Sequence, residues 1–230
     1  MIAGPTLSVV IPTLNAASAL PPALAQFESA RAGGLVRELV VSDGGSRDGS
    51  VALAEAAGAT VVSGLPGRGQ QLARGAKSTR GDWLLFLHAD TRLDVGWEAD
   101  VTGFLAPADE EREAAFTFAL DDGAPAARKL EWMVAWRCRL LALPYGDQGL
   151  LVSRRLYDDL GGFRPIPLME DVDLVRRIGR ERLSIFASRA VTSAARYRRD
   201  GYVRRPLRNL GCLSLFFAGV PPHLIARLYG

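Results

Sequence analysis

The sequence has few of the residues that build disulfide frameworks or metal clusters. Its 230 residues include only two cysteines, Cys138 and Cys212. Two cysteines give neither a disulfide framework nor a metal-ligand spacing, so we expect a reducing, cytoplasmic setting. The net charge of +3 is also small, and a balance so close to neutrality does not indicate a nucleic-acid partner.

Long apolar runs are missing as well. The nearest candidate, 210–220, ends at Pro221-Pro222 and is shorter than the ~20 residues of a membrane span. The first residues carry neither the charged region nor the cleavage site of a secretory signal. Hydrophobic residues still make up 48% of the chain and charged residues 23%, which suits one large α/β domain or two small ones.

Strand-like and helix-like stretches alternate through the first half of the chain. We expect strands at 7–11, 38–42, 60–62 and 83–87, and helices at 17–32, 50–57 and 67–79. Ser50 is the expected N-cap of the second helix. This βαβαβαβ order implies parallel strands with helices on both faces, so the predicted fold class is α/β with a mainly parallel nucleotide-binding sheet.

The second half is less regular. We expect strands at 114–120 and 150–152, a long helix at 125–143, a helical turn at 155–160 and a helix at 170–180. The last helix has an acidic first turn and a basic last turn, which suits its dipole.

The stretch 83–91 is the strongest candidate for the centre of a site. Five apolar residues, 83–87, predict a strand buried on both faces, and Asp90 follows at its carboxyl end. Open α/β sheets bind ligands at this edge, and a carboxylate there can hold a divalent cation on a phosphate. The alternative is that Asp90 caps the next turn. His88 can add a metal ligand or a hydrogen bond, although a lone histidine at a strand end is more often structural.

Asp43 ends the second strand as Asp90 ends the fourth, so the two carboxylates can face one crevice. Asp43 can accept hydrogen bonds from a base or ribose; alternatively it forms the turn before Gly44. The loop 44–49 lets backbone approach a ligand closely, but it is neither a P-loop nor a G-x-G-x-x-G motif.

Two further loops contain candidate ligand-contacting residues. Gly67-Arg68-Gly69 can present Arg68 and backbone N–H groups to a phosphate, or leave Arg68 as an ordinary surface residue. Asp147-Gln148 lies between Gly146 and Gly149 and can position a polar substrate, although this motif is weak by itself.

Glu170-Asp171 follows the apolar, proline-containing segment 165–169. Acidic residues in a first helical turn often serve only the helix dipole. A carboxylate with a carboxylate neighbour and apolar surroundings can also have a raised pKa and act as a general base.

Four motifs in this order and spacing resemble those of the family 2 glycosyltransferases, which have the GT-A fold. They are Val10-Ile11-Pro12-Thr13-Leu14-Asn15, the run 41–50 around Asp43, Phe86-Leu87-His88-Ala89-Asp90-Thr91, and Met169-Glu170-Asp171-Val172-Asp173-Leu174. The resemblance covers about residues 6–190. The run 67–91 resembles a small bacterial subgroup with a His-Ala-Asp-Thr motif and an uncertain substrate.

The resemblance implies transfer of a sugar from a nucleotide diphosphate donor to an acceptor hydroxyl, with inversion, using Mg²⁺ or Mn²⁺. By position it implies donor-binding roles for Pro12, Thr13, Asn15, Asp43, Gly44 and Arg68. Asp90 would hold the metal and Asp171 would be the base, with Glu170 beside it. Gly146, Asp147 and Gln148 would lie on the acceptor side. The sequence departs from the family at His88, where an aspartate is usual.

The same resemblance divides the chain into a nucleotide-binding half, 1–92, an acceptor half, 93–195, and a basic-apolar helical segment, 196–230. The processive members' Gln-x-x-Arg-Trp motif is missing, so a polymerising synthase is not expected. Two alternatives stay open, a nucleotidyltransferase and a non-catalytic module that binds a nucleotide sugar or a membrane surface.

The last segment is rich in arginine. Its basic residues are Arg196, Arg198, Arg199, Arg204, Arg205 and Arg208. We expect this segment to contact an anionic partner, which is either the donor diphosphate or a membrane surface touched through 196–220; an ordinary basic surface helix is the alternative. The acceptor is not specified, with a lipid-linked one among the candidates, and a homodimer is left open.

Overall fold

The computed structural model describes residues 5–107 and 109–229 and contains one eight-stranded sheet in the order β3-β2-β1-β4-β7-β6-β8-β5. The strands are β1 (Leu7–Thr13), β2 (Val36–Asp43), β3 (Thr60–Ser63), β4 (Trp83–Phe86), β5 (Thr91–Leu93), β6 (Glu113–Leu120), β7 (Leu150–Ser153) and β8 (Leu183–Thr192). This is the α/β architecture that the order of strands and helices predicts, and it agrees with the GT-A fold that the family resemblance implies.

The first four strands run parallel, because β1 pairs with β2 and β4, and β2 pairs with β3. Strand β4 lies in the middle of the sheet and is buried along its whole length. The prediction of a strand buried on both faces at 83–87 is therefore confirmed, and the carboxyl ends of β1, β2 and β4 meet at one edge.

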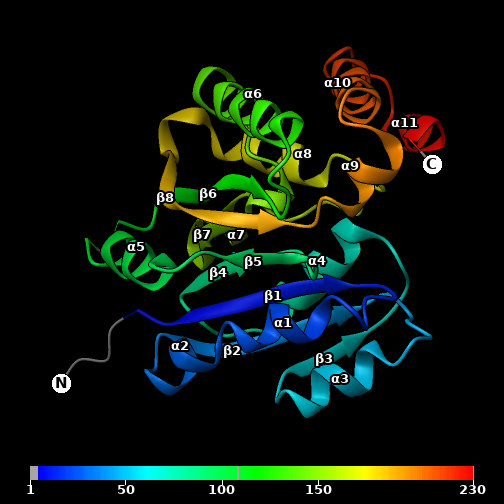
Figure 1. Ribbon diagram of the computed structural model, residues 1–230. Helices are drawn as coiled ribbons and strands as arrows, with labels where there is room; N and C mark the ends of the chain where they lie inside the picture. The colour runs from blue at the N-terminus through cyan, green and yellow to red at the C-terminus, as the bar shows by residue number, and fades with distance from the viewer. Residues whose placement is uncertain (1–4, 108, 230) are drawn as a thin grey trace.

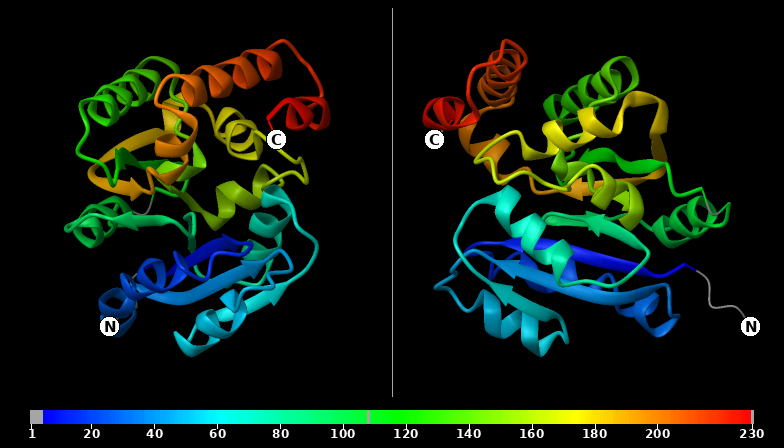
Figure 2. Two further views of the ribbon diagram at one scale, coloured as in Figure 1. Left: turned by 45° about the vertical axis from the view of Figure 1, so that its right-hand side comes forward. Right: turned by 180° about the vertical axis from the view of Figure 1, so that it is seen from behind.

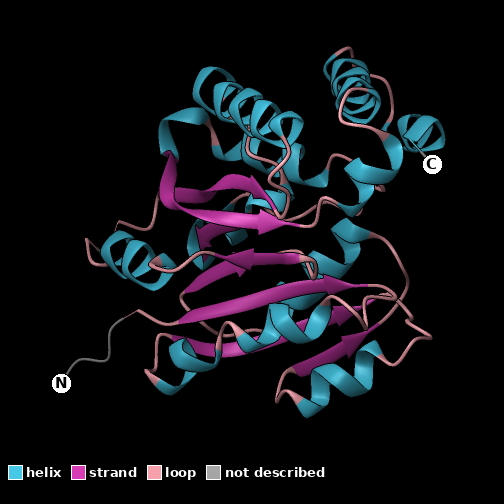
Figure 3. Ribbon diagram, viewed as in Figure 1, coloured by secondary structure: helices cyan, strands magenta, loops and turns pink. Residues whose placement is uncertain are grey.

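Helices cover the sheet on both sides (Figure 3). They are α1 (Leu20–Ala25), α2 (Glu28–Ala32), α3 (Ser50–Ala56), α4 (Arg68–Lys77), α5 (Trp97–Leu105), α6 (Pro125–Leu141), α7 (Arg154–Asp159), α8 (Glu170–Ile178), α9 (Ala195–Asp200), α10 (Arg204–Phe217) and α11 (Pro222–Tyr229), with short 3-10 turns η1 (Gly146–Gln148) and η2 (Arg180–Arg182). None of the helices in 5–107 and 109–229 is long and apolar enough to cross a membrane.

Two local predictions are wrong. The helix expected over 17–32 is divided into α1 and α2, because Gln26 bonds to the backbone of Thr91 and Leu93 while Phe27 packs on Trp97. Ser50 does not occupy the N-cap of α3, which is Gly49. The Ser50 hydroxyl instead accepts a hydrogen bond from the N–H of Ala16, in the turn after β1.

The second half of the chain continues the same sheet instead of building another. Strand β7 pairs antiparallel with β4 on one side and with β6 on the other, and β8 pairs with both β6 and β5. The sheet therefore crosses the expected division at 92/93. Helices α6, α10 and α11 lie at one end of the molecule, beyond β6 and β8, in each view of Figures 1 and 2.

Candidate active site

Two clefts meet at the carboxyl end of β4. The β1 cleft is bordered by the turn after β1 and the start of α4, with Pro12, Asn15, Gly67 and Gln71 in its wall. The α9 cleft is bordered by η1, the start of α8, and the α9–α10 segment, with Tyr145, Gly146, Asp147, Asp171, Tyr197, Arg205 and Asn209 in its wall. Four residues line both clefts, namely Arg68, His88, Asp90 and Arg196.

His88 and Asp90 both follow β4 and therefore lie at this junction. Burial lowers the pKa of the His88 imidazole well below its usual range, and the positive charges of Arg68 and Arg196 lower it further. The imidazole is therefore neutral and can donate or accept through its nitrogens. His88 lies so close to Gly146 that a Cβ atom built there would be 2.7 Å from Nε2.

The predicted donor-binding residues fall into two groups. Pro12, Asn15 and Arg68 line the β1 cleft. Thr13 and Asp43 are almost completely buried and do not reach its surface.

The carboxylate of Asp43, for which holding a base or ribose stays a prediction, bonds to its own loop. Its Oδ2 atom accepts hydrogen bonds from the N–H groups of Gly45 at 2.7 Å and Ser46 at 3.0 Å. Asp43 thereby forms the turn that was the alternative interpretation. Asn15, in the left-handed region at φ 50°, accepts a bond from the Arg47 N–H and extends the same loop.

Gln71 is a site residue that sequence reasoning missed. Its Nε2 atom donates to the carbonyls of Thr13 at 2.8 Å and Ser42 at 2.9 Å, and its Oε1 atom accepts from the Gly67 N–H. It therefore ties the ends of β1 and β2 to the start of α4, and its side chain lies against Gly44. A glutamine inside a helix gives no local signal of this role.

The start of α4 is held against the segment before α8. A Cβ atom at Gly69 would be 2.4 Å from the Arg164 carbonyl oxygen, so only glycine allows this approach. The approach brings Arg68 within 3.4 Å of the Glu170 carboxylate, which is almost completely buried. Burial raises the pKa of Glu170, the Asp171 charge raises it further, and Arg68 opposes both.

Asp171 faces the α9 cleft, whereas Glu170 turns toward Arg68. The Oδ2 atom of Asp171 accepts a hydrogen bond from the Gly146 N–H at 2.7 Å, and Oδ1 accepts one from the Val172 N–H at 2.8 Å. Met169, just before α8, is in the left-handed region at φ 66°. Such backbone strain is typical of functional sites.

Gly146, Asp147 and Gln148 form η1, and they have different surroundings. Gly146 and Asp147 line the α9 cleft, and the buried Oδ1 atom of Asp147 has no hydrogen-bond partner among residues 5–107 and 109–229. Gln148 is buried instead. It bonds to Arg137 at 3.0 Å and to the Phe116 carbonyl at 3.0 Å, so it fixes the loop and does not reach the cleft.

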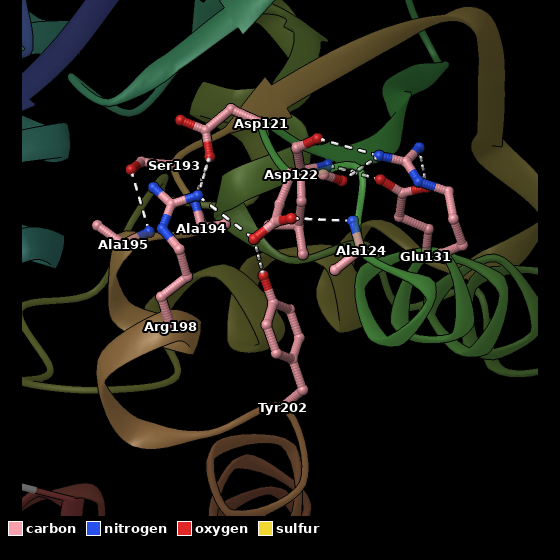
Figure 4. Close-up of polar contacts among 11 residues, drawn as sticks. Asp121, Asp122, Ala124, Glu131, Ser193, Ala194, Ala195, Arg198 and Tyr202 are labelled. Carbon is pink, nitrogen blue, oxygen red and sulfur yellow. Dashed lines mark hydrogen bonds and ion pairs between the residues drawn. The ribbon is translucent and has the colours of Figure 1, made fainter.

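The α9–α10 segment, which lines the α9 cleft, is held by two aspartates that follow β6 (Figure 4). Asp121 accepts from the Ala194 N–H at 2.6 Å, and Asp122 accepts from the Tyr202 hydroxyl at 2.6 Å. Arg198 lies within ion-pair distance of both carboxylates.

This attachment leaves part of the arginine-rich segment in the site. Arg205 is buried, pairs with Asp200 at 2.8 Å, and lines the α9 cleft together with Asn209. Asn209 was not predicted, and the buried Oδ1 atom of its side chain has no hydrogen-bond partner in the described part of the chain.

The junction fits a cation that is shared with a phosphate. Within the described ranges, no group of three or more His, Cys, Asp or Glu side chains is arranged to hold a metal ion. Mg²⁺ bound to a nucleotide needs only one or two protein carboxylates, since phosphate and water complete its shell. Asp90 offers the carboxylate, and the neutral His88 offers a second donor atom.

A comparison with protein families identifies the class. Residues 8–140 match the family described as glycosyl transferase family 2, and the chain belongs to it. It is therefore a glycosyltransferase by class, which decides against a nucleotidyltransferase. Asp171 and the α9–α10 segment lie outside the matched residues.

Individual relatives come from mycobacteria. The glucosyl-3-phosphoglycerate synthase of Mycobacterium tuberculosis is 38% identical over 97 residues, covering 38% of this chain and 30% of the relative. A PGL/p-HBAD biosynthesis glycosyltransferase of Mycobacterium bovis is 35% identical over 112 residues, covering 46% of this chain and 42% of the relative. The matches thus span about a third to two fifths of these relatives' length.

Solved structures extend the similarity to most of the fold. A complex of the same M. tuberculosis synthase with Mn²⁺, UDP-glucose and phosphoglyceric acid has a TM-score of 0.60 at 27% identity, covering 79% of this chain and 69% of that chain. Its complex with Mn²⁺, UDP and glucosyl-3-phosphoglycerate has a TM-score of 0.62 at 24% identity, covering 95% of this chain and 81% of that chain. This second similarity shows only that the two chains share a fold.

Proposed function

We propose that this chain transfers a sugar from a nucleoside diphosphate donor to an acceptor hydroxyl, with inversion and with the help of Mg²⁺ or Mn²⁺. The observation that carries this proposal is the meeting of two clefts at Arg68, His88, Asp90 and Arg196. Inverting transfer needs the acceptor hydroxyl on the face of the anomeric carbon opposite the leaving diphosphate, so the donor and acceptor sites must adjoin. Among the described residues, only this junction borders both clefts.

The β1 cleft suits the donor. Its wall holds Pro12 and Asn15 at the carboxyl edge of the parallel strands, where open α/β sheets bind nucleotides. Asp90 and His88 would hold the metal, which when bound supplies positive charge to the departing diphosphate. The structure of the M. tuberculosis synthase with Mn²⁺ and UDP-glucose supports a metal ion and a nucleotide-sugar donor for this fold.

The α9 cleft suits the acceptor, with Asp171 as the general base. The acceptor oxygen forms its bond to the anomeric carbon while the bond from that carbon to the diphosphate oxygen breaks, and the hydroxyl proton passes to Asp171. The bonds from the Gly146 and Val172 N–H groups hold the carboxylate in one orientation. Arg68 and Arg196 meet the negative charge that develops on the leaving diphosphate.

The wall of the α9 cleft favours an acceptor that carries an anionic group beside its hydroxyl. Arg196 and Arg205 line this cleft, and the side-chain amide of Asn209 adds a polar contact. The phosphoglyceric acid bound by the M. tuberculosis synthase has this character.

Metal-dependent donor binding tests the proposal directly. A thermal-shift panel of UDP-, GDP- and dTDP-sugars with Mn²⁺ should give one donor that raises Tm, because a ligand at 100 times its Kd stabilises by ~2.7 kcal/mol. Chelation of the metal should remove most of that shift, and so should Asp90→Ala. Equal stabilisation of Asp90→Ala and the unchanged chain, both with Mn²⁺, would show that Asp90 does not hold the metal.

The stereochemistry of the product tests inversion. With the donor found by the panel and a suitable hydroxyl acceptor, the product's anomeric configuration by NMR should be opposite to that of the donor. Retention of the donor configuration would contradict a single displacement assisted by one base.

A further inference from the structure

Three helices at one end of the molecule expose many large apolar side chains. They are Trp132, Met133, Trp136, Leu140 and Leu141 on α6, Leu207, Leu210 and Phe217 on α10, and Leu224 and Leu228 on α11. The three helices lie at the same end in each view of Figures 1 and 2. Contiguous exposed apolar surface on a folded chain usually marks an interaction site.

Helix α6 shows the pattern most clearly. Trp132 and Trp136 are 61% and 45% exposed, and their ring centroids lie 5.7 Å apart. The opposite side of α6 is buried against β6 through Leu130, Val134 and Cys138. The exposed tryptophans therefore point away from the body of the molecule.

The charges on these helices are almost all of one sign. The basic residues are Arg128, Lys129, Arg137, Arg139, Arg204, Arg205, Arg208 and Arg227, against a single acidic residue, Glu131. The rest of the chain has more acidic than basic residues. Lys129, Arg139, Arg204 and Arg227 are exposed, and none of them forms an ion pair within the described residues.

The helices are also tied together. Asp122, just before α6, accepts the Ala124 N–H at 2.9 Å and the Tyr202 hydroxyl at 2.6 Å, which links the start of α6 to the α9–α10 segment (Figure 4). Helix α11 packs on α10. The three helices are thus fixed relative to one another and are not independent arms.

We propose that this end of the molecule docks on the surface of an anionic phospholipid membrane, with Trp132 and Trp136 in the headgroup region and the exposed cations on lipid phosphates. Tryptophan and leucine beside arginine and lysine are the composition of interfacial helices. The surface extends the 196–220 contact expected from the sequence to α6. A second copy of the chain fits less well, because two such faces would place positive charge against positive charge.

The tryptophans provide a selective probe. The chain has four, and the other two, Trp83 and Trp97, are buried in the body. With the full chain and phosphatidylglycerol vesicles at low salt, we expect co-flotation, a blue shift of emission, and quenching by brominated lipid. Phosphatidylcholine vesicles should bind much less, and high salt should weaken the binding.

Matched variants locate the contact. Lys129→Glu with Arg139→Glu should lower partitioning onto anionic vesicles by about tenfold or more, since each basic residue near such a surface is worth about 1 kcal/mol. Trp132→Ala with Trp136→Ala should abolish the quenching and weaken the binding. The controls are Lys77→Glu on α4 and Leu65→Ala in the loop before it. Both residues are exposed and lie outside the three helices, so these changes should have little effect.

Three results would overturn the proposal. The first is no binding to anionic vesicles at low salt, and the second is binding that neither double variant changes. The third is a dimer of the unchanged chain that Trp132→Ala with Trp136→Ala dissociates, since a second copy would then cover this face. All variants change exposed side chains, so their Tm values should match that of the unchanged chain.

Discussion

Asp147 lies in the α9 cleft among several charged groups. Burial, opposed by the charge of Arg137 and assisted by the charges of Asp171 and Asp90, raises the pKa of its carboxyl to about 6. The folded chain therefore holds this proton at a higher pH than the unfolded chain. Stability from this group is present below its ordinary value of 3.8 and is lost as the pH rises to about 6.

Asp147→Asn removes this charge and should stabilise the chain at pH 7.5 by on the order of 1–3 kcal/mol. At pH 4 the change should be close to zero, because the carboxyl is largely protonated in the folded state there. Thermal unfolding at both pH values measures the effect, with the exposed Asp158→Asn as control. A gain that is the same at both pH values would contradict the assignment.

Gly146 allows His88 and Asp171 to approach the same point. In Gly146→Ala the new Cβ would lie 2.7 Å from Nε2 of His88 and 3.4 Å from Oδ2 of Asp171, so the imidazole must move. We expect turnover to fall by about 10–100-fold, since a shift of an ångström in a catalytic group costs on this order. Gly103→Ala, where nothing lies within 4 Å, should retain normal turnover in the same assay.

At the scale of elements, the packing of α4 against the segment before α8 sets the position of Arg68, which lines both clefts. Gly69→Ala places a methyl group 2.4 Å from a backbone carbonyl that cannot rotate away, so we expect a loss of about 1–3 kcal/mol in unfolding free energy. Gly211→Ala, on a helix with open space around it, should instead be neutral or stabilising. Denaturant unfolding compares the two, and equal effects would contradict this explanation.

The sequence was sufficient to predict the parallel half of the sheet. Short β-branched or apolar runs bounded by glycine or proline set β1 to β4, and local signals of this kind do not depend on the rest of the chain. The division between α1 and α2 could not be predicted, because it depends on Gln26 and Phe27 reaching β5 and Trp97, both more than 60 residues away. The antiparallel insertion of β7 between β4 and β6 likewise has no local signal.

The candidate site, too, could be predicted only where its residues have a local sequence signal. Asp90, Arg68 and Asp171 stand next to strand ends or helix starts, where local sequence indicates a ligand-facing position. Gln71 and Asn209 lie inside helices, and only the tertiary fold brings them to the clefts. Asp43 shows that a correct strand-end prediction still leaves open whether the carboxylate meets a ligand or its own loop.

At the scale of the whole molecule, the two clefts are built by different parts of the chain. The β1 cleft uses residues from the turn after β1 and from α4, whereas the α9 cleft uses η1, α8, α9 and α10. Of these two clefts, Asp171 lines only the α9 cleft, so removal of its basicity should affect the chemical step and not donor binding. Glu170, its neighbour, is buried against Arg68 and should not substitute for it.

The kinetics and donor affinity of Asp171→Asn, measured beside Glu170→Gln, test the central assignment most directly. Asp171→Asn keeps the shape of the side chain and removes its basicity, so kcat should fall about 10²–10⁴-fold while the Kd for the donor stays nearly unchanged. Glu170→Gln should keep kcat within about tenfold of the unchanged chain, because its carboxyl does not face the acceptor side. Full activity in Asp171→Asn, or a collapse of kcat confined to Glu170→Gln, would contradict Asp171 as the base.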